Sequence, residues 1–184
     1  MSGIARVQPE ATLHPGKLDL LARWLPDQWW FDGDSSDLEI VARFRFVDPN
    51  DVVGLDCMLV RSMDAVTWRP HPLDCGALIG TLQHSELGTR YCYDAQTDPV
   101  YLDELVRVIR EKDSDADIVA IGQDTPYPRN IKVFGSGLVA GETSGYPHVV
   151  HKLNRAPIND VVGQLMGQWR HRGIDRVDLL AVLH

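Results

Sequence analysis

The chain has 184 residues, of which 44% are hydrophobic and 24% charged, as expected for a globular protein with one core or one core plus a small appended module. A formal net charge of -8 and the lack of a Lys/Arg run argue against nucleic acid and anionic membranes as partners. No apolar run suits a membrane span or a leader, and the three cysteines have no CxxC spacing, so we expect a cytoplasmic protein with reduced thiols.

The first helix is predicted over residues 15–25. Pro15 suits its first turn, leucines recur at helical spacing, and Pro26 ends it. A cluster of aromatic residues falls within eight positions at and after its end: Trp24, Trp29, Trp30 and Phe31. Such a cluster either closes a core or presents an aromatic face to a ligand, and both interpretations are kept.

A β-hairpin is predicted next. Apolar side chains alternate with Arg43 and Arg45 in the second half of residues 38–46, which is typical of a half-buried strand. Residues 48–51 predict a turn, because Asp, Pro and Asn dominate turns. The returning strand and three further short strands are expected at 52–60, 65–68, 77–82 and 89–93.

A second helix is predicted after residue 98. Asp98 can cap it, Pro99 fits its first position, and an apolar stripe follows at helical spacing. An acidic segment, residues 113–117, comes next and resembles a calcium loop in its alternate aspartates. Ile118 stands where such a loop needs glycine, so a solvated acidic linker is predicted instead.

The remainder of the chain is predicted to be nearly all β. Strands are expected at residues 118–121, 130–134, 149–153, 161–169 and 176–183. The glycines within 135–141 are interpreted as hairpin-turn residues, because their spacing does not match a dinucleotide-binding loop. We therefore expect an α+β fold with antiparallel pairing, in two parts, 1–112 and 113–184, packed as one compact unit.

A family resemblance rests on three groups of residues. The first, called here the opening motif, is Trp24-Leu25, Gln28, Trp30-Phe31 and Gly33. The second is Leu78-Ile79-Gly80-Thr81, His84, Leu87-Gly88, Arg90, Tyr93-Asp94-Ala95 and Asp98-Pro99-Val100-Tyr101. The third is residues 150–155, Gly167-Gln168-Trp169 and residues 180–183. Together they resemble stand-alone proteins with a maltokinase N-terminal cap-like domain, some of which are labelled α-glucan branching proteins.

The resemblance implies a cystatin-like cap, a curved antiparallel sheet packed on one or two helices, followed by a mostly antiparallel β segment. Two positions depart from the cap pattern: Trp29 and Asp34 stand where relatives carry basic residues. The sequence has no His-Gly-Asp or His-Arg-Asp loop of the kind that phosphotransfer requires. Kinase activity is therefore not carried over from the resemblance.

No catalytic residue, cofactor or metal site is predicted. The residues proposed for binding are Asp27, Trp29, Trp30, Asp32, His84 and Arg90. His84 and Arg90 have a second interpretation, in which they bond backbone and Asp94 and hold a hairpin. His148 and His151, three apart in a predicted strand, would face opposite sides and are poorly placed for one metal.

The leading hypothesis is a non-catalytic binding or regulatory module of α-glucan or maltose–trehalose metabolism. Its partner would be a glucan-pathway enzyme or an oligosaccharide. One alternative is a small carbohydrate-active enzyme whose carboxylates, drawn from Glu39, Asp56, Glu86 and Asp94, face one cleft. Another is a structural homodimer that pairs edge strands of the C-terminal β segment.

Overall fold

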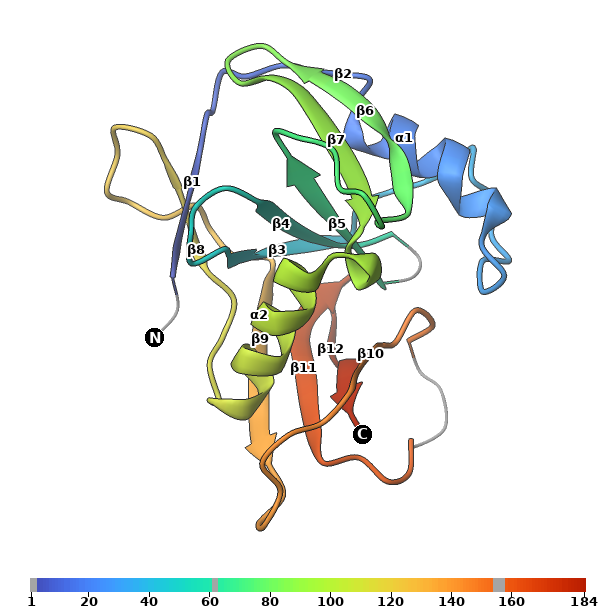
Figure 1. The fold of residues 1–184 in the computed structure, drawn as a ribbon, viewed down its shortest axis with the longest axis vertical. Helices are drawn as coiled ribbons and strands as arrows, with labels where there is room; N and C mark the ends of the chain where they lie inside the picture. Colours follow the sequence, from blue (N-terminus) through green and yellow to red (C-terminus); the bar gives the residue numbers. More distant parts are fainter. Residues whose placement is uncertain (1–2, 61–62, 154–157) are drawn as a thin grey trace.

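The computed structural model describes residues 3–60, 63–153 and 158–184 (Figure 1). The N-terminal part contains strand β1 (Ile4–Val7), strand β2 (Leu13–His14), helix α1 (Lys17–Trp24) and a 3₁₀ turn, η1 (Leu25–Asp27). The predicted helix is therefore confirmed with different ends: it begins at Lys17 after the N-cap Gly16, so Pro15 lies outside it, and Leu25 belongs to η1. Neither β1 nor β2 was predicted, because two to four residues are too short to show a period.

A curved six-stranded antiparallel sheet forms the upper half of the molecule as drawn in Figure 1. Its five longer strands are β3 (Ala42–Val47), β4 (Gly54–Leu59), β5 (Met63–Arg69), β6 (Leu78–His84) and β7 (Gly88–Asp94). The strand order is β2-β6-β7-β5-β4-β3. Asp48 accepts hydrogen bonds from the backbone N–H groups of Asn50, Val52 and Val53, and so closes the predicted β3–β4 turn.

Helix α2 (Pro99–Arg110) begins where the sequence predicts. A second 3₁₀ turn, η2 (Ala95–Thr97), leads into it. The Asp98 carboxylate accepts the backbone N–H of Val100 at 3.0 Å and forms a two-pronged ion pair with Arg69 on β5. One buried carboxylate thus caps the helix and ties it to the sheet.

The C-terminal part adds five strands: β8 (Asp117–Ala120), β9 (Ile131–Leu138), β10 (Pro147–Val149), β11 (Gly163–His171) and β12 (Ile174–Leu183). The last four form an antiparallel sheet in the order β10-β12-β11-β9, while β8 pairs with β1 in parallel. The α+β class with mostly antiparallel pairing is confirmed. The strand predicted at 149–153 is displaced, because β10 ends at Val149, and residues 154 and 155 of the third resemblance group lie outside the described residues.

One hydrophobic core lies between the two sheets and contains α2. It joins buried side chains of β3 and β4, including Phe44 and Leu55, to Leu105 and Ile109 of α2 and to residues of β9, β10, β11 and β12 such as Leu165. A second core lies on the opposite face of the six-stranded sheet, under α1. Both faces of that sheet are therefore covered by other parts of this chain.

The glycines of β9 correct one sequence prediction. Gly135 and Gly137 lie inside the strand, and only Gly141, with φ +95°, lies in a turn after it. A Cβ added at Gly135 would lie 2.2 Å from the carbonyl oxygen of Val108 in α2. Glycine is required there because the helix backbone packs directly on the strand.

The acidic segment 113–117 is also not the solvated linker that was predicted. Asp113 and Asp115 are buried, with 7% and 2% of their surface exposed. Asp113 is paired with Arg107 of α2, and Asp115 accepts hydrogen bonds from Arg129 and from the backbone N–H of Val133. Charged residues can be buried when they are paired, and sequence spacing does not reveal the partner. The boundary between parts 1–112 and 113–184 stays a prediction.

Within residues 3–60, 63–153 and 158–184, no helix is long and apolar enough to cross a membrane.

Candidate functional site

The chain leaves α1 through η1, and the two adjacent tryptophans that follow, Trp29 and Trp30, lie in opposite environments. Pro26 ends the helix, Leu25 is fully buried, and the Gln28 side chain bonds the carbonyl of Trp24 at 3.2 Å. In the turn that follows, Trp30 points inward with 6% of its surface exposed, whereas Trp29 is 85% exposed. The two interpretations of the aromatic cluster therefore apply to different rings.

Trp30 is held on three sides by other rings. It meets Trp24 edge to face at 6.0 Å and Phe31 at 6.3 Å. On a third side the imidazole of His151 is stacked on it, with ring centroids 4.0 Å apart and planes 7° from parallel. Aromatic pairs in these geometries add to the stabilisation from burial alone. Trp30 is thus a core residue that also anchors the C-terminal part of the chain.

Two polar contacts complete this attachment. The side-chain amide nitrogen of Gln96 in η2 lies 2.8 Å from Nε2 of His151. An amide nitrogen can only donate, so Nε2 accepts this hydrogen bond. The ammonium group of Lys152 lies 2.5 Å from the Asp32 carboxylate. The segment after β10 is therefore joined both to the opening motif and to the turn that precedes α2.

A shallow pocket of about 60 Å³ opens between these segments. We call it the aromatic pocket; its walls are Trp29, Trp30, His148, Val149, Val150, His151, Lys152 and Ile158. It contains an exposed indole, two imidazoles and an ammonium group, with the Asp32 carboxylate paired to that ammonium. This set can stack on a ring and exchange hydrogen bonds with neutral polar groups.

Of the six residues proposed from the sequence, Trp29 and Trp30 line the aromatic pocket, and Asp32 is tied to it through Lys152. Asp27 is exposed in η1, on the approach to the pocket along the chain. His84 and Arg90 belong instead to the β6–β7 hairpin, at the top of Figure 1. The structure thus joins three of the six and separates the hairpin pair from them.

In that hairpin, the ring nitrogen Nδ1 of His84 accepts hydrogen bonds from the backbone N–H groups of Glu86 and Leu87, both at 3.2 Å. Partial burial lowers the pKa of His84, and the positive charge of Arg90 lowers it further. Arg90 donates to the carbonyl of Thr89 at 3.1 Å. The predicted bonds to backbone are confirmed, but Asp94 accepts from the N–H of Gln96 instead.

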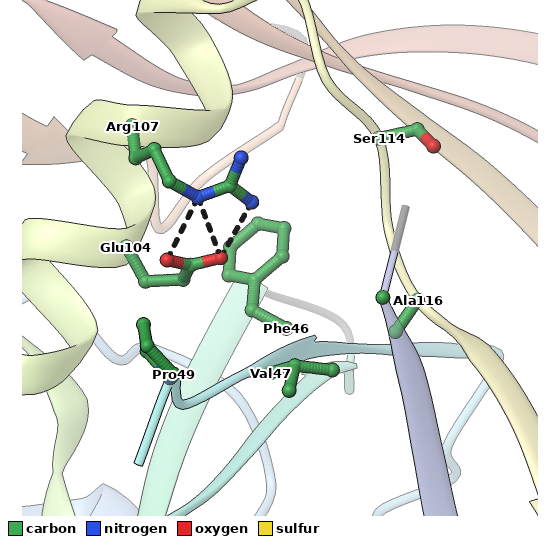
Figure 2. A pocket seen from close by; sticks show the side chains of 8 residues that line it. Phe46, Val47, Pro49, Glu104, Arg107, Ser114 and Ala116 are labelled. Atoms are coloured by element: carbon green, nitrogen blue, oxygen red, sulfur yellow. Dashed lines mark hydrogen bonds and ion pairs between the residues drawn. The ribbon is translucent and has the colours of Figure 1, made fainter. Parts of the chain in front are cut away.

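A larger cleft, about 190 Å³, lies between α2, β3 and the N-terminal strand (Figure 2). Glu104 lines this cleft, and its carboxylate accepts hydrogen bonds from the guanidinium of Arg107. Arg107 also binds Glu111 and Asp113, and the hydrogen bonds that it donates to Glu104 are the largest cause of its raised pKa. Because this cation is shared among three carboxylates, the cluster serves to attach α2 to residue 113.

The carboxylates suggested for an enzyme lie in separate elements. Asp56, on β4, is buried and paired with Lys17 and Arg45. Asp94 caps η2, and Glu39 and Glu86 are exposed in loops. Glycoside hydrolysis uses two carboxylates facing one cleft, and neither cleft described above is lined by any of these four. Among the described residues, therefore, neither cleft is lined by the pair of carboxylates that the enzyme alternative requires.

Sequence reasoning missed the C-terminal half of the aromatic pocket. His148 and His151 were considered only as metal ligands, and they line one pocket because the strand ends at Val149, between them. Lys152 and Gln96 carried no signal, because their partners lie 120 and 55 positions away in the chain. Of the residues that line the pocket, Trp29 and Trp30 were identified from their local pattern.

Residues 24–98 match the family model described as the maltokinase N-terminal cap domain. The match begins at the first tryptophan of the opening motif and ends at Asp98, the cap of α2, so it contains strands β3 to β7. This segment is a maltokinase N-terminal cap-like domain. A search of the curated proteins gave no match.

Proposed function

We propose that this chain, whose residues 24–98 form a maltokinase N-terminal cap-like domain, is a non-catalytic binding or regulatory module of α-glucan and maltose–trehalose metabolism. The family name supports the metabolic setting. In this proposal the protein is cytoplasmic and acts by contact with a glucan-pathway enzyme or with an oligosaccharide. Its contact surface is the exposed side of the aromatic pocket, with Asp27 and Asp32 beside it.

The burial of the cap-like sheet supports a contact through loops. One face of the sheet packs against α1, and the other packs against α2 and the C-terminal sheet. A partner could not reach either face without unfolding the module. Binding through the cap-like sheet must therefore use an edge strand or a connection between elements, and the loop after α1 is such a connection.

The observation that carries the proposal is the exposure of Trp29. Tryptophan is enriched among the residues that dominate binding energy, and this ring is 85% exposed at the rim of a pocket. Burying a tryptophan removes about 150–250 Å² from water, a gross gain of roughly 4–6 kcal/mol before the costs of association. One ring is thus large enough to decide whether a weak complex forms.

The test is direct binding with purified components. Maltokinase, trehalose synthase and glucan branching enzyme are each titrated with the full chain, and maltooligosaccharides are titrated by calorimetry. We expect at least one of these to bind the wild-type protein, and Trp29→Ala to weaken that binding. Ile174→Ala, which alters a residue 67% exposed at the β11–β12 turn, is the matched control and should bind normally.

If no enzyme and no oligosaccharide binds the wild-type chain, the proposal fails. It also fails if binding occurs but is equal in the Trp29→Ala and Ile174→Ala variants, since the contact would then lie elsewhere.

A homodimer is the second candidate, and one observation favours it. Strand β10 is an edge of the four-stranded sheet, and the ladder continues to Tyr146, which exchanges backbone hydrogen bonds with His184 and is 75% exposed. An uncovered strand edge can pair with a second copy. Light scattering after size exclusion decides this, because a monomer at micromolar concentration contradicts it.

A further inference from the structure

We infer that the aromatic pocket is a subsite for one neutral glucosyl unit of an α-glucan, with Trp29 as the platform on which the sugar ring stacks. This inference rests on the proposed function for the class of ligand. It adds the site, the stacking residue and the requirement that the ligand be uncharged.

The Trp29 platform is held on a fixed turn. On one side, Gln28 is bonded to the carbonyl of Trp24, and the backbone N–H of Phe31 bonds the carbonyl of Gln28 at 3.0 Å. On the other side, Trp30 is locked between the core and the ring of His151. A ring presented on such a turn loses little conformational freedom when a ligand binds.

The chemistry of an indole face suits the C–H side of a hexose. The face of an aromatic ring carries partial negative charge, so it attracts the polarised C–H groups of one side of a pyranose. The hydroxyl groups then project sideways, each able to donate and to accept a hydrogen bond. Around Trp29, the ring nitrogens of His148, the ammonium of Lys152 and the carboxylate of Asp32 offer both kinds of partner.

The charges around the pocket favour a neutral ligand over a charged one. Lys152 and Asp32 form an ion pair, so the single ammonium of the wall is already balanced. The loop that carries Trp29 is otherwise acidic, with exposed carboxylates at Asp27, Asp34, Asp37 and Glu39. Among the described residues that line the pocket, Lys152 is the one Lys or Arg. A sugar phosphate would therefore bring its negative charge to an acidic loop and a cation already paired with Asp32, whereas an uncharged glucan has no charge to be repelled.

The size of the pocket favours a sugar lying across it. A volume of about 60 Å³ is well below the roughly 300 Å³ at which pockets begin to enclose a small molecule. A protein partner would need to cover about 800 Å² on each side, with few charged residues at the centre. The surface next to Trp29 is an acidic loop, so a stacked ring with hydroxyl contacts fits it better.

The subsite is built jointly by two distant segments. The platform belongs to the cap-like domain, and the polar wall belongs to residues 148–152 and Ile158. The His151 stack and the Lys152 ion pair hold these segments together.

The experiment is titration of the full chain with maltohexaose, followed by calorimetry and by ligand-observed saturation-transfer NMR. We expect weak binding by the wild-type protein, reduced roughly tenfold or more by Trp29→Ala. Trp29→Phe, which keeps an aromatic face, should retain part of the affinity, and Ile174→Ala should retain all of it. Because Trp29 is exposed, its variants should keep the wild-type circular dichroism and unfolding midpoint.

Four results would overturn the inference. The first is equal maltohexaose binding by wild type and Trp29→Ala. The second is tighter binding of glucose 1-phosphate than of maltohexaose, which contradicts the charge argument. The third is binding of a glucan-pathway enzyme through Trp29 with no saccharide binding, which leaves the proposed function intact. The fourth is no binding of any kind, in which case both fail.

Discussion

Replacing Gly135 with alanine tests the packing of α2 on β9. The added Cβ would lie 2.2 Å from the Val108 carbonyl oxygen and 2.6 Å from the Ile109 Cα, both helix backbone atoms. Ordinary contact begins near 3.4 Å, so the strand and helix must separate by about 1.2 Å, the difference between these distances. A flexible side chain could turn aside, but a helix backbone must move as a unit.

The cost follows from what that movement opens. Leu105, Val108 and Ile109 are fully buried in the core between the sheets. Each contributes roughly 1.5–3 kcal/mol by burial. A gap of about 0.5–1 Å beside a buried side chain removes about a quarter to a half of its van der Waals attraction to the atoms across the gap. We expect Gly135→Ala to lower the free energy of unfolding by about 2–4 kcal/mol, and so to lower the melting temperature by about 4–16 °C.

Urea denaturation followed by tryptophan fluorescence measures this change. Lys132→Ala, at an exposed position of the same strand, is the control and should stay within about 0.5 kcal/mol of wild type. If Gly135→Ala is as stable as the control, then α2 does not pack on β9 as described, and the physical account of this glycine is wrong.

Three further predictions concern buried charges and thiols. Burial alone would raise the pKa of Asp56, but its two cationic partners outweigh burial and lower it; Asp56→Asn should therefore cost about 3–5 kcal/mol at pH 7. Because the folded pKa is lowered, wild-type stability should fall as the pH drops below about 4, the unfolded value. A stability profile with the same acid slope in Asp56→Asn would contradict this assignment. Asp98→Asn keeps an N-cap acceptor but loses the ion pair to Arg69, so it should destabilise less than Asp98→Ala in thermal unfolding; equal losses would mean that the cap contributes nothing. Cys75 is the one exposed thiol of three, so Ellman's reagent should titrate one equivalent rapidly in the native protein and three after denaturation; two or more rapid equivalents would show that the cores open.

The sequence predicted those elements whose signals are local. The Asp98 cap, the apolar stripe of α2 and the alternation around Arg43 and Arg45 each act within a few residues, and the structure has all three. The prediction for Gly135 was wrong because the reason for that glycine lies on a helix about 27 residues earlier in the chain. A spacing rule treats such a glycine as a turn residue, because only the packed structure reveals the close approach.

The same limit applied to the aromatic pocket. Trp29 was identified from its neighbours, but its opposing wall comes from residues whose type carries no local signal. The acidic segment gave the opposite error, since Asp113 and Asp115 look solvated until Arg107 and Arg129 are placed beside them. Long-range charge pairs and stacked rings therefore determined most of what the sequence alone could not predict.

The parallel pairing of β1 with β8 has a consequence for synthesis on the ribosome. Ile4 pairs with Asp117, so β1 leaves the ribosome 113 residues before its partner. At about 5–20 residues per second, this strand waits roughly 6–23 s for its partner to be made. During that interval its backbone N–H and C=O groups are open to pairing with other nascent chains. Expression at low temperature lengthens this interval. A chaperone that holds the nascent chain keeps these groups from pairing with other chains, and it should therefore improve the yield of native protein.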